Sequence, residues 1–157
     1  MLTNFVSFKS FVKKKKSKSL QKYLKECINS EDEVITSLTN KYKYSYTKNF
    51  LKKFKKFKFI RIFGMGGSSL GTHGIYDFLK HKINRDFTFI FNLGQGKFYP
   101  KKEYLNLVIS KSGNTLETIV NSNIYINKKE KNIFITENKK NILKDIGLKL
   151  KNEIIDH

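Results

Sequence analysis

A chain of 157 residues with 39% apolar and 14% aromatic side chains is long enough for one domain with a hydrophobic core. Its only cysteine, Cys27, excludes an internal disulfide and fits a reducing compartment, so we expect a cytoplasmic protein. No run of about 18 apolar residues is present that could span a membrane. The first apolar residues precede the lysine run at positions 13–16 instead of following it, which argues against a secretory signal.

The formal net charge of +19 would normally indicate a nucleic acid or another anionic partner. The positive charge is almost entirely lysine, since Arg61 and Arg85 are the only arginines, and it is spread along the whole chain. Specific nucleic-acid sites tend to use the forked guanidinium of arginine. We therefore interpret most of the lysine as solvated surface and do not expect nucleic acid as the partner.

Residues 1–54 have mainly helical patterns. Apolar residues recur at helical spacing from Leu20 to Ile28, which predicts a helix that ends just before Ser30. Ser30 is then expected to cap a second helix, with Glu33 at the capping-box position.

Tyrosine and phenylalanine are interleaved with lysine between positions 42 and 57. Such a pattern can bind single-stranded nucleic acid. A helix that packs its aromatic rings inward, while the lysine stems extend to solvent, gives the same pattern, and we favour this interpretation. We place the boundary between a helical leader, residues 1–54, and an α/β domain, residues 55–157, within this stretch.

The rest of the chain alternates between apolar runs and helical patterns. Strands are predicted at residues 57–63, 87–91, 105–109, 131–136 and 153–156, and helices up to residue 79 and at residues 115–127 and 138–150. On the helix at 115–127 the positions expected to face inward are Ile119, Val120, Ile124 and Ile126, and the helix at 138–150 carries Ile142, Leu143, Ile146 and Leu150. Residues 93–103, which include the only proline, are predicted to be irregular. The alternation predicts an α/β fold with a doubly wound, mostly parallel five-stranded sheet flanked by helices.

The first strand ends in residues 64–71, Gly-Met-Gly-Gly-Ser-Ser-Leu-Gly. A dinucleotide fingerprint would need a third glycine where Ser69 stands and an acid where Asn92 ends the next strand. The nucleoside triphosphate loop fails as well, because no lysine follows the glycines at the required place. Two interpretations remain: a glycine turn that brings the backbone close to an anion, and a plain strand-to-helix turn capped by serine.

The third strand ends in a loop with an unusual number of hydroxyl groups. Four hydroxyls and one amide lie within residues 110–118, whereas one of them would be enough to cap a helix. The carboxyl ends of parallel strands share one edge of a sheet, so the two loops are expected to form one crevice for a phosphate.

Both loops resemble those of glucose-6-phosphate isomerases. Residues 64–71 are similar to the Gly-Ile-Gly-Gly-Ser-x-Leu-Gly segment of that family, and residues 109–118 to its Ser-Lys-Thr/Ser-x-x-Thr-x-Glu-Thr segment. Residues 134–136 and 154–157 resemble later family segments. The resemblance covers about residues 55–157, and either motif alone would indicate only a sugar isomerase (SIS) domain.

The resemblance implies an SIS-type domain that binds glucose 6-phosphate or fructose 6-phosphate in glycolysis and gluconeogenesis, with no cofactor and no metal. It implies a homodimer in the full-length family, or a companion chain that carries the second half. The residues that match the phosphate-binding positions are Gly66, Gly67, Ser68, Ser110, Lys111, Ser112 and Thr115.

The resemblance places no catalytic residue in this chain. The family's arginine, glutamate base, ring-opening histidine and late lysine are expected beyond His157, in a second SIS domain, and neither His73 nor His81 matches that histidine. The family's Asn-x-Asp segment after the second strand is also missing. We therefore expect the phosphate-binding half of an aldose–ketose isomerase that is inactive alone. A stand-alone sugar-phosphate-binding regulatory module and a lysine-rich nucleic-acid-binding protein remain as alternatives.

Overall fold

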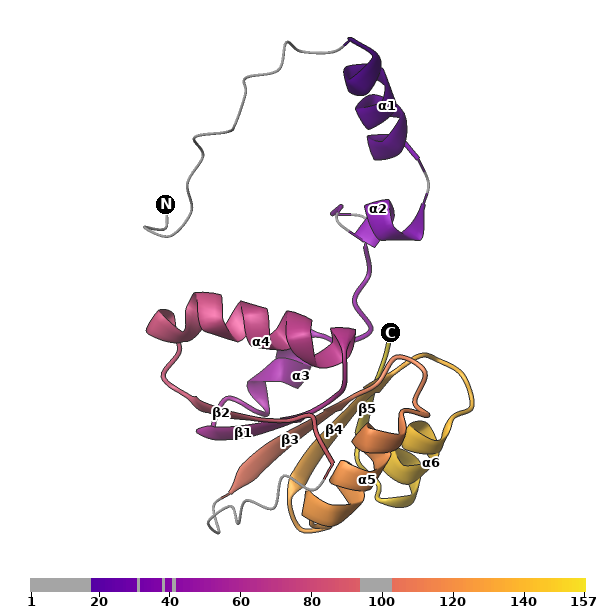
Figure 1. The fold of residues 1–157 in the computed structure, drawn as a ribbon. Coiled ribbons are helices and arrows are strands. Elements are labelled where there is room, and N and C mark those ends of the chain that lie inside the picture. Colours follow the sequence, from indigo (N-terminus) through magenta and orange to yellow (C-terminus); the bar gives the residue numbers. More distant parts are fainter. Residues whose placement is uncertain (1–17, 31, 38, 41, 94–102) are drawn as a thin grey trace. The chain divides into compact units, whose positions relative to one another are not determined.

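The computed structural model describes residues 18–30, 32–37, 39–40, 42–93 and 103–157. The chain divides into two compact units, Met1–Lys43 and Tyr44–His157. In the first unit, the described elements are helix α1 (Lys18–Ile28) and the short helix α2 (Glu33–Ser37) (Figure 1). Ser30 was expected to cap the second helix, but α2 begins three residues later. The Ser30 hydroxyl instead donates to the carbonyl of Cys27 at 2.8 Å, at the end of α1.

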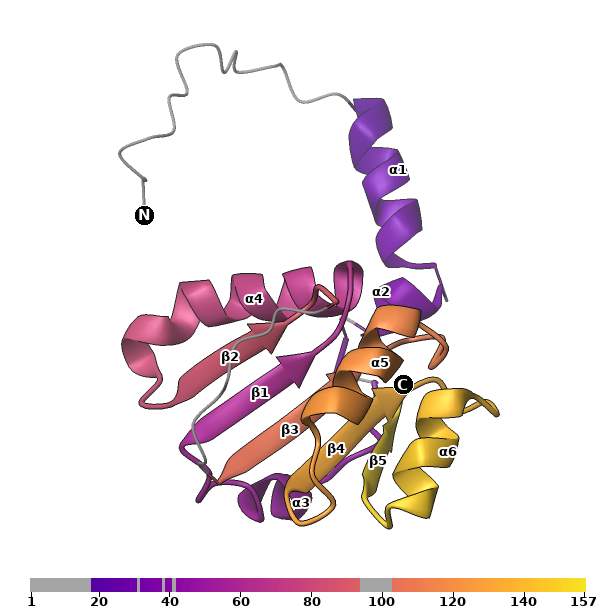
Figure 2. The same cartoon turned by 60° about the horizontal axis from the view of Figure 1, so that its bottom comes forward.

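The second unit contains a five-stranded, wholly parallel sheet with the order β2-β1-β3-β4-β5. All five strands point the same way (Figure 2). This confirms the predicted α/β fold with its flanking helices. The strands are β1 (Phe59–Phe63), β2 (Asp86–Ile90), β3 (Tyr104–Ile109), β4 (Lys131–Thr136) and β5 (Glu153–Asp156).

Helices cover both faces of the sheet (Figures 1 and 2). Helices α3 (Lys48–Lys52) and α4 (Gly67–Leu79) lie on one face, and a 3₁₀ turn, η1 (Lys80–Lys82), follows α4. Helices α5 (Leu116–Tyr125) and α6 (Ile142–Lys149) lie on the other face. The connection from β1 leads outward to β2, while those from β3 and β4 lead in the opposite direction. The order of the strands therefore reverses between β1 and β3, which is where ligands bind in open α/β sheets.

The phenylalanines before β1 pack inward. Phe54 and Phe57 are each 5% exposed and join Ile60 and Ile62 in one hydrophobic core, with Phe50 packed against them. This confirms the packed interpretation for the phenylalanines. The tyrosine part of the pattern differs, because Tyr44 is 65% exposed and the helix, α3, includes only Lys48–Lys52. The same packing groups residues 44–54 with the sheet, whereas we had expected them to belong to the leader.

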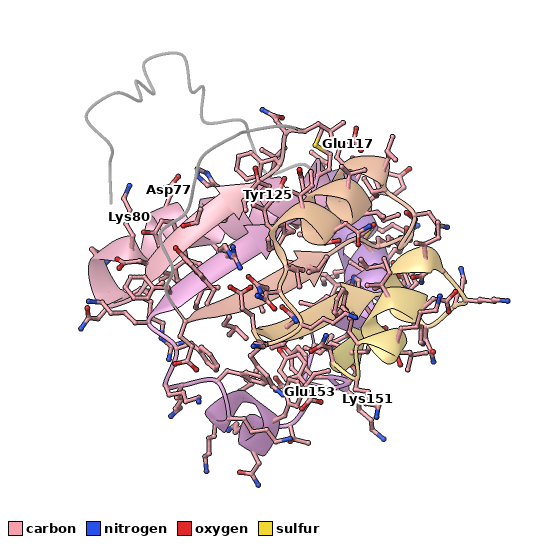
Figure 3. The ribbon with its side chains drawn as sticks, turned by 90° about the horizontal axis from the view of Figure 1, so that it is seen from below. Asp77, Lys80, Glu117, Tyr125, Lys151 and Glu153 are labelled. Carbon is pink, nitrogen blue, oxygen red and sulfur yellow. The ribbon has the colours of Figure 1, made fainter. Side chains whose placement is uncertain are left out.

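The opposite face carries an apolar row and a polar row. Phe63, Val108 and Phe134 are fully buried and adjacent in register. Tyr125, which Figure 3 labels, comes from α5 and packs against Phe63. The polar row lies two residues nearer the amino ends of the strands, and consists of Arg61, Asn106 and Asn132.

One residue predicted to face inward is exposed. Ile124 is 60% exposed, so this prediction is wrong. Helix α5 instead buries polar side chains against the sheet: Thr118, Asn121 and Ser122. The predicted irregular segment 93–103 falls mostly outside the described residues.

Candidate functional site

The loop after β1 begins α4 without a side-chain cap. Gly66 is the N-cap residue and has a positive φ of 58°, which favours glycine. Among the described residues, none gives this helix a side-chain cap, and the Ser69 hydroxyl instead donates to the carbonyl of Gly66 at 3.1 Å. A Cβ atom on Gly64 would lie 3.2 Å from the carbonyl oxygen of Ile109, so this loop runs close to the end of β3.

The loop after β3 is built around a pair of hydroxyl groups. Ser110 is 3% exposed, and its Oγ lies 2.9 Å from the Oγ1 of Thr115 while accepting the N–H of Gly113 at 3.2 Å. Two hydroxyls in contact use one of their two protons for each other. The pair therefore keeps one O–H proton for a ligand.

Helix α5 also begins without a side-chain cap, because the Thr115 hydroxyl contacts Ser110 instead of the helix. Helices α3 and α6 start elsewhere and have side-chain caps. Thr47 accepts the N–H of Phe50 at 3.2 Å in α3, and Asn141 accepts the N–H of Lys144 at 2.8 Å in α6. The starts of α4 and α5 both lie at the strand reversal, where their N–H groups are available to an anion.

The second loop is held in place by β4 and α6. The Lys111 carbonyl accepts the Thr136 hydroxyl at 3.2 Å and the N–H of Glu137 at 3.0 Å. The side-chain oxygen of Asn114 accepts the N–H of Ile142 at 3.2 Å. These bonds from two other elements fix the backbone of the loop before any ligand arrives.

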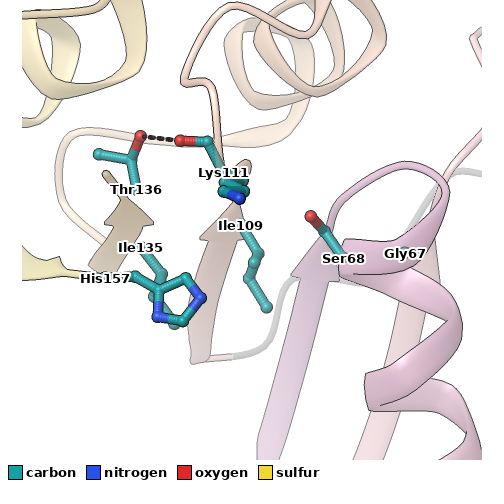
Figure 4. A pocket seen from close by; sticks show the side chains of 7 residues that line it. All are labelled: Gly67, Ser68, Ile109, Lys111, Ile135, Thr136 and His157. Carbon is teal, nitrogen blue, oxygen red and sulfur yellow. Dashed lines mark hydrogen bonds between the residues drawn. The ribbon is translucent and has the colours of Figure 1, made fainter. Parts of the chain in front are cut away.

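A pocket of about 450 Å³ lies beside these loops. Figure 4 shows Ser68 on one side of it, with Lys111 and Thr136 across from it. The lining residues are Gly67, Ser68, Ile109, Lys111, Ile135, Thr136 and His157. Three of the residues expected at the phosphate are among them; Ser110 is buried next to this lining, and Gly66, Ser112 and Thr115 belong to the same two loops.

One acidic residue, Glu137, lies between two lysines at the carboxyl end of β4. The Glu137 carboxylate lies 3.8 Å from Nζ of Lys111 and 3.2 Å from Nζ of Lys139. Hydrogen bonding and charge from Lys139, and then the charge of Lys111, hold the pKa of the Glu137 carboxyl below its usual range. Glu137 is therefore ionised at neutral pH.

Sequence reasoning did not assign Thr136, Glu137 and His157 to the site. The sequence did contain one indication for Thr136. It is a hydroxyl residue at the end of the fourth strand, just as Ser110 is a hydroxyl residue directly after the third. Within the described residues, no group of His, Cys, Asp and Glu side chains could hold a metal ion. No helix in the described ranges is long and apolar enough to cross a membrane.

No protein-family model matches this chain. Two curated proteins that match part of it are named glucose-6-phosphate isomerase. The protein of Borrelia garinii subsp. bavariensis is 36% identical, and that of Borreliella afzelii 34% identical, each over 90 residues. Each match covers 50% of this chain and 17% of the relative, so the chain corresponds to a small part of these proteins.

Two solved structures share the fold. The hypothetical protein TT0462 from Thermus thermophilus superposes with a TM-score of 0.57 and 16% identity, over 68% of this chain and 29% of its own. The Vibrio vulnificus NanR protein, in complex with ManNAc-6P, gives a TM-score of 0.50 and 16% identity, over 69% of this chain and 40% of its own. At this identity, the two likenesses show the fold alone.

Proposed function

We propose that this chain binds the phosphate group of a sugar phosphate where β1 and β3 end, as the phosphate-binding part of a glucose-6-phosphate isomerase. The observation that carries the proposal is the pair of uncapped helix starts at the strand reversal, beside a pocket lined by Ser68 and Lys111. Backbone N–H groups, hydroxyls and one ammonium group are the donors that a phosphoryl dianion requires.

The relatives support this choice of ligand. The partial matches to two glucose-6-phosphate isomerases are consistent with an isomerase substrate, glucose 6-phosphate or fructose 6-phosphate. The NanR protein, which shares the fold, was solved with ManNAc-6P, so this fold can accommodate a sugar phosphate.

The site supplies binding and orientation and does not supply proton transfer. Aldose–ketose isomerisation moves a proton between adjacent carbons through an enediolate, which requires a carboxylate base and a cation near the developing oxyanion. The described residues that line the pocket include Lys111 and His157 but no carboxylate. We therefore propose that the phosphate is held here to fix the reacting carbons. The base would come from outside this chain.

The test is calorimetric titration of fructose 6-phosphate into the wild type and into Ser110→Ala and Thr115→Ala. Each change removes one of the two paired hydroxyls, and a lost hydrogen bond to a charged ligand weakens binding by about ten- to a hundredfold. Ser122→Ala is the matched control, because the hydroxyl of Ser122 is buried on α5 and donates to the carbonyl of Ile119 at 2.8 Å, away from the loop. Equal affinities in all four proteins would refute the proposed site.

A steady-state isomerase assay separates this proposal from a binding-only module. We expect the 157-residue chain to bind fructose 6-phosphate without turnover. Turnover should return when a part that carries the base is supplied. Binding that no additional part converts into turnover would favour a stand-alone regulatory module.

A further inference from the structure

The clearest unexplained feature beside the site is Glu137, a carboxylate that does not line the pocket but forms an ion pair with Lys111, which does. Glu137 directly follows β4, and its main-chain N–H bonds the carbonyl of Lys111 at 3.0 Å. Thr136 donates to the same carbonyl. The end of β4 and the second loop are therefore fixed against each other. This keeps the carboxylate of Glu137 near the ammonium group of Lys111.

Glu137 forms ion pairs with both Lys111 and Lys139, but the two pairs differ in distance. Glu137 is 23% exposed and accepts both neighbouring ammonium groups, whereas Lys111 is 75% and Lys139 77% exposed. The closer contact is to Lys139, at 3.2 Å against 3.8 Å to Lys111. Lys111 can therefore leave the carboxylate while Lys139 still neutralises it.

Lys111 also lines the pocket beside Gly67 and Ser68, the first turn of α4. A phosphoryl group bound at that turn would draw on the same ammonium group. The phosphoryl group and the carboxylate of Glu137 would then compete for Lys111. Because both are anions, they would also repel each other.

We propose that Glu137 acts as a tethered competitor of the ligand phosphate, holding Lys111 in the free protein and releasing it when a phosphoryl dianion binds at the start of α4. The inference rests on the proposed function, and it adds a residue that limits the affinity of the site for phosphate. A free monoanion must displace a carboxylate that is attached to the chain. A dianion that also bonds the N–H groups of α4 has the additional contacts needed to displace it.

The test compares Glu137→Gln with a variant that changes the net charge equally. Glu103 is the matched control, because it forms an exposed ion pair with Lys56 at 3.5 Å and lies just before β3, at the opposite end of the strand. Glu137→Gln should bind inorganic phosphate about two- to fivefold more tightly than the wild type, the range that one exposed ion pair supplies. Glu103→Gln should change the affinity much less, because the two ends of β3 are about 20 Å apart and salt screens the charge at that distance.

A second readout follows the contact directly. On titration of the wild type with inorganic phosphate, the side-chain ¹³C resonance of the Glu137 carboxylate should shift as Lys111 leaves it, while that of Glu103 stays in place. Equal affinities of Glu137→Gln and Glu103→Gln, or weaker binding by Glu137→Gln, would overturn the inference and leave the proposed function standing. A wild type that binds neither inorganic phosphate nor fructose 6-phosphate would overturn both.

Discussion

Gly113 is a single residue on which the loop and the neighbouring helix both depend. Its φ is +67°, and an added Cβ atom would lie 2.0 Å from the side-chain oxygen of Asn141, the N-cap residue of α6. Gly113→Ala must therefore strain the backbone and displace the cap. Each effect costs about 1 kcal/mol, so we expect the free energy of unfolding in urea to fall by about 2 kcal/mol.

A glycine-to-alanine change at another position should increase the free energy of unfolding instead. Gly74 lies inside α4, and an added Cβ would meet no atom within 4 Å. Gly74→Ala should raise the free energy of unfolding by about 0.5–1 kcal/mol, because alanine loses less conformational entropy than glycine in a helix. If both variants shift stability in the same direction, the close contact between Gly113 and Asn141 is not the cause of the loss.

The sequence could suggest side chains for the site only where they lie close together along the chain. The hydroxyls of Ser110 and Thr115 lie five residues apart in one loop, and the structure brings them into contact. Thr136 bonds Lys111 across 25 residues, and nothing in the local pattern announces such a contact. Pairing of β3 with β4 creates it, so Thr136 and Glu137 were recognised only after the sheet was known.

At the scale of the elements, a row of polar side chains crosses three neighbouring strands inside the fold. Arg61 is 4% exposed, donates to Asn106 at 2.8 Å, forms an ion pair with Glu130 and lies 4.2 Å from the centre of the Tyr104 ring. Asn106 in turn donates to Asn132 at 2.7 Å. The row is tolerated in a buried sheet because these donors have acceptors within it.

Removing one partner of the ion pair between Arg61, which is buried, and Glu130, which is half-buried, should be worse than removing both. Glu130→Ala leaves the guanidinium of Arg61 without its carboxylate, so we expect a loss of about 3 kcal/mol in urea unfolding. In the double variant Arg61→Met/Glu130→Ala, an apolar chain of similar length fills the space and no charge remains buried. The double variant should be at least about 1 kcal/mol more stable than Glu130→Ala alone. A double variant whose loss equals the sum of the losses of Arg61→Met and Glu130→Ala would show that the two side chains are not coupled.

The elements themselves were largely predictable, and the faces of the helices were not. All five strands were predicted within two residues of their observed ends, because each is an apolar run bounded by polar or glycine residues. Helical spacing predicted Ile124 on the inner face of α5, but the structure turns it to solvent and buries Thr118 and Asn121 instead. Hydrophobic spacing fails here because the buried side chains of this helix are polar and bond main-chain carbonyls: Asn121 donates to that of Asn92 at 3.3 Å and Ser122 to that of Ile119 at 2.8 Å.

For the whole molecule, the meeting of the two loops follows from topology. Parallel strands joined through helices place both loops at one edge, and the order β2-β1-β3-β4-β5 sets them side by side at the reversal. The sequence alone predicted the shared edge, because two loops of one design follow two strands. It could not predict that α6 and β4 also brace the second loop, because that requires the positions of elements later in the chain.

The net charge of +19 supplies a long-range attraction for any anion, and this makes the nucleic-acid alternative testable on the whole molecule. We expect binding of a single-stranded RNA to be non-specific, with a Kd weaker than about 10⁻⁶ M at physiological salt and a steep loss of affinity as salt rises. Ser110→Ala should leave this RNA affinity unchanged while weakening fructose 6-phosphate binding, because a buried hydroxyl contributes nothing to the distant field of 32 basic residues. Fluorescence anisotropy with a labelled RNA between about 50 and 200 mM salt measures the first quantity, and calorimetry the second. Nanomolar RNA binding at physiological salt that survives Ser110→Ala, with no binding of fructose 6-phosphate, would reverse the assignment and make the lysine-rich surface the functional site.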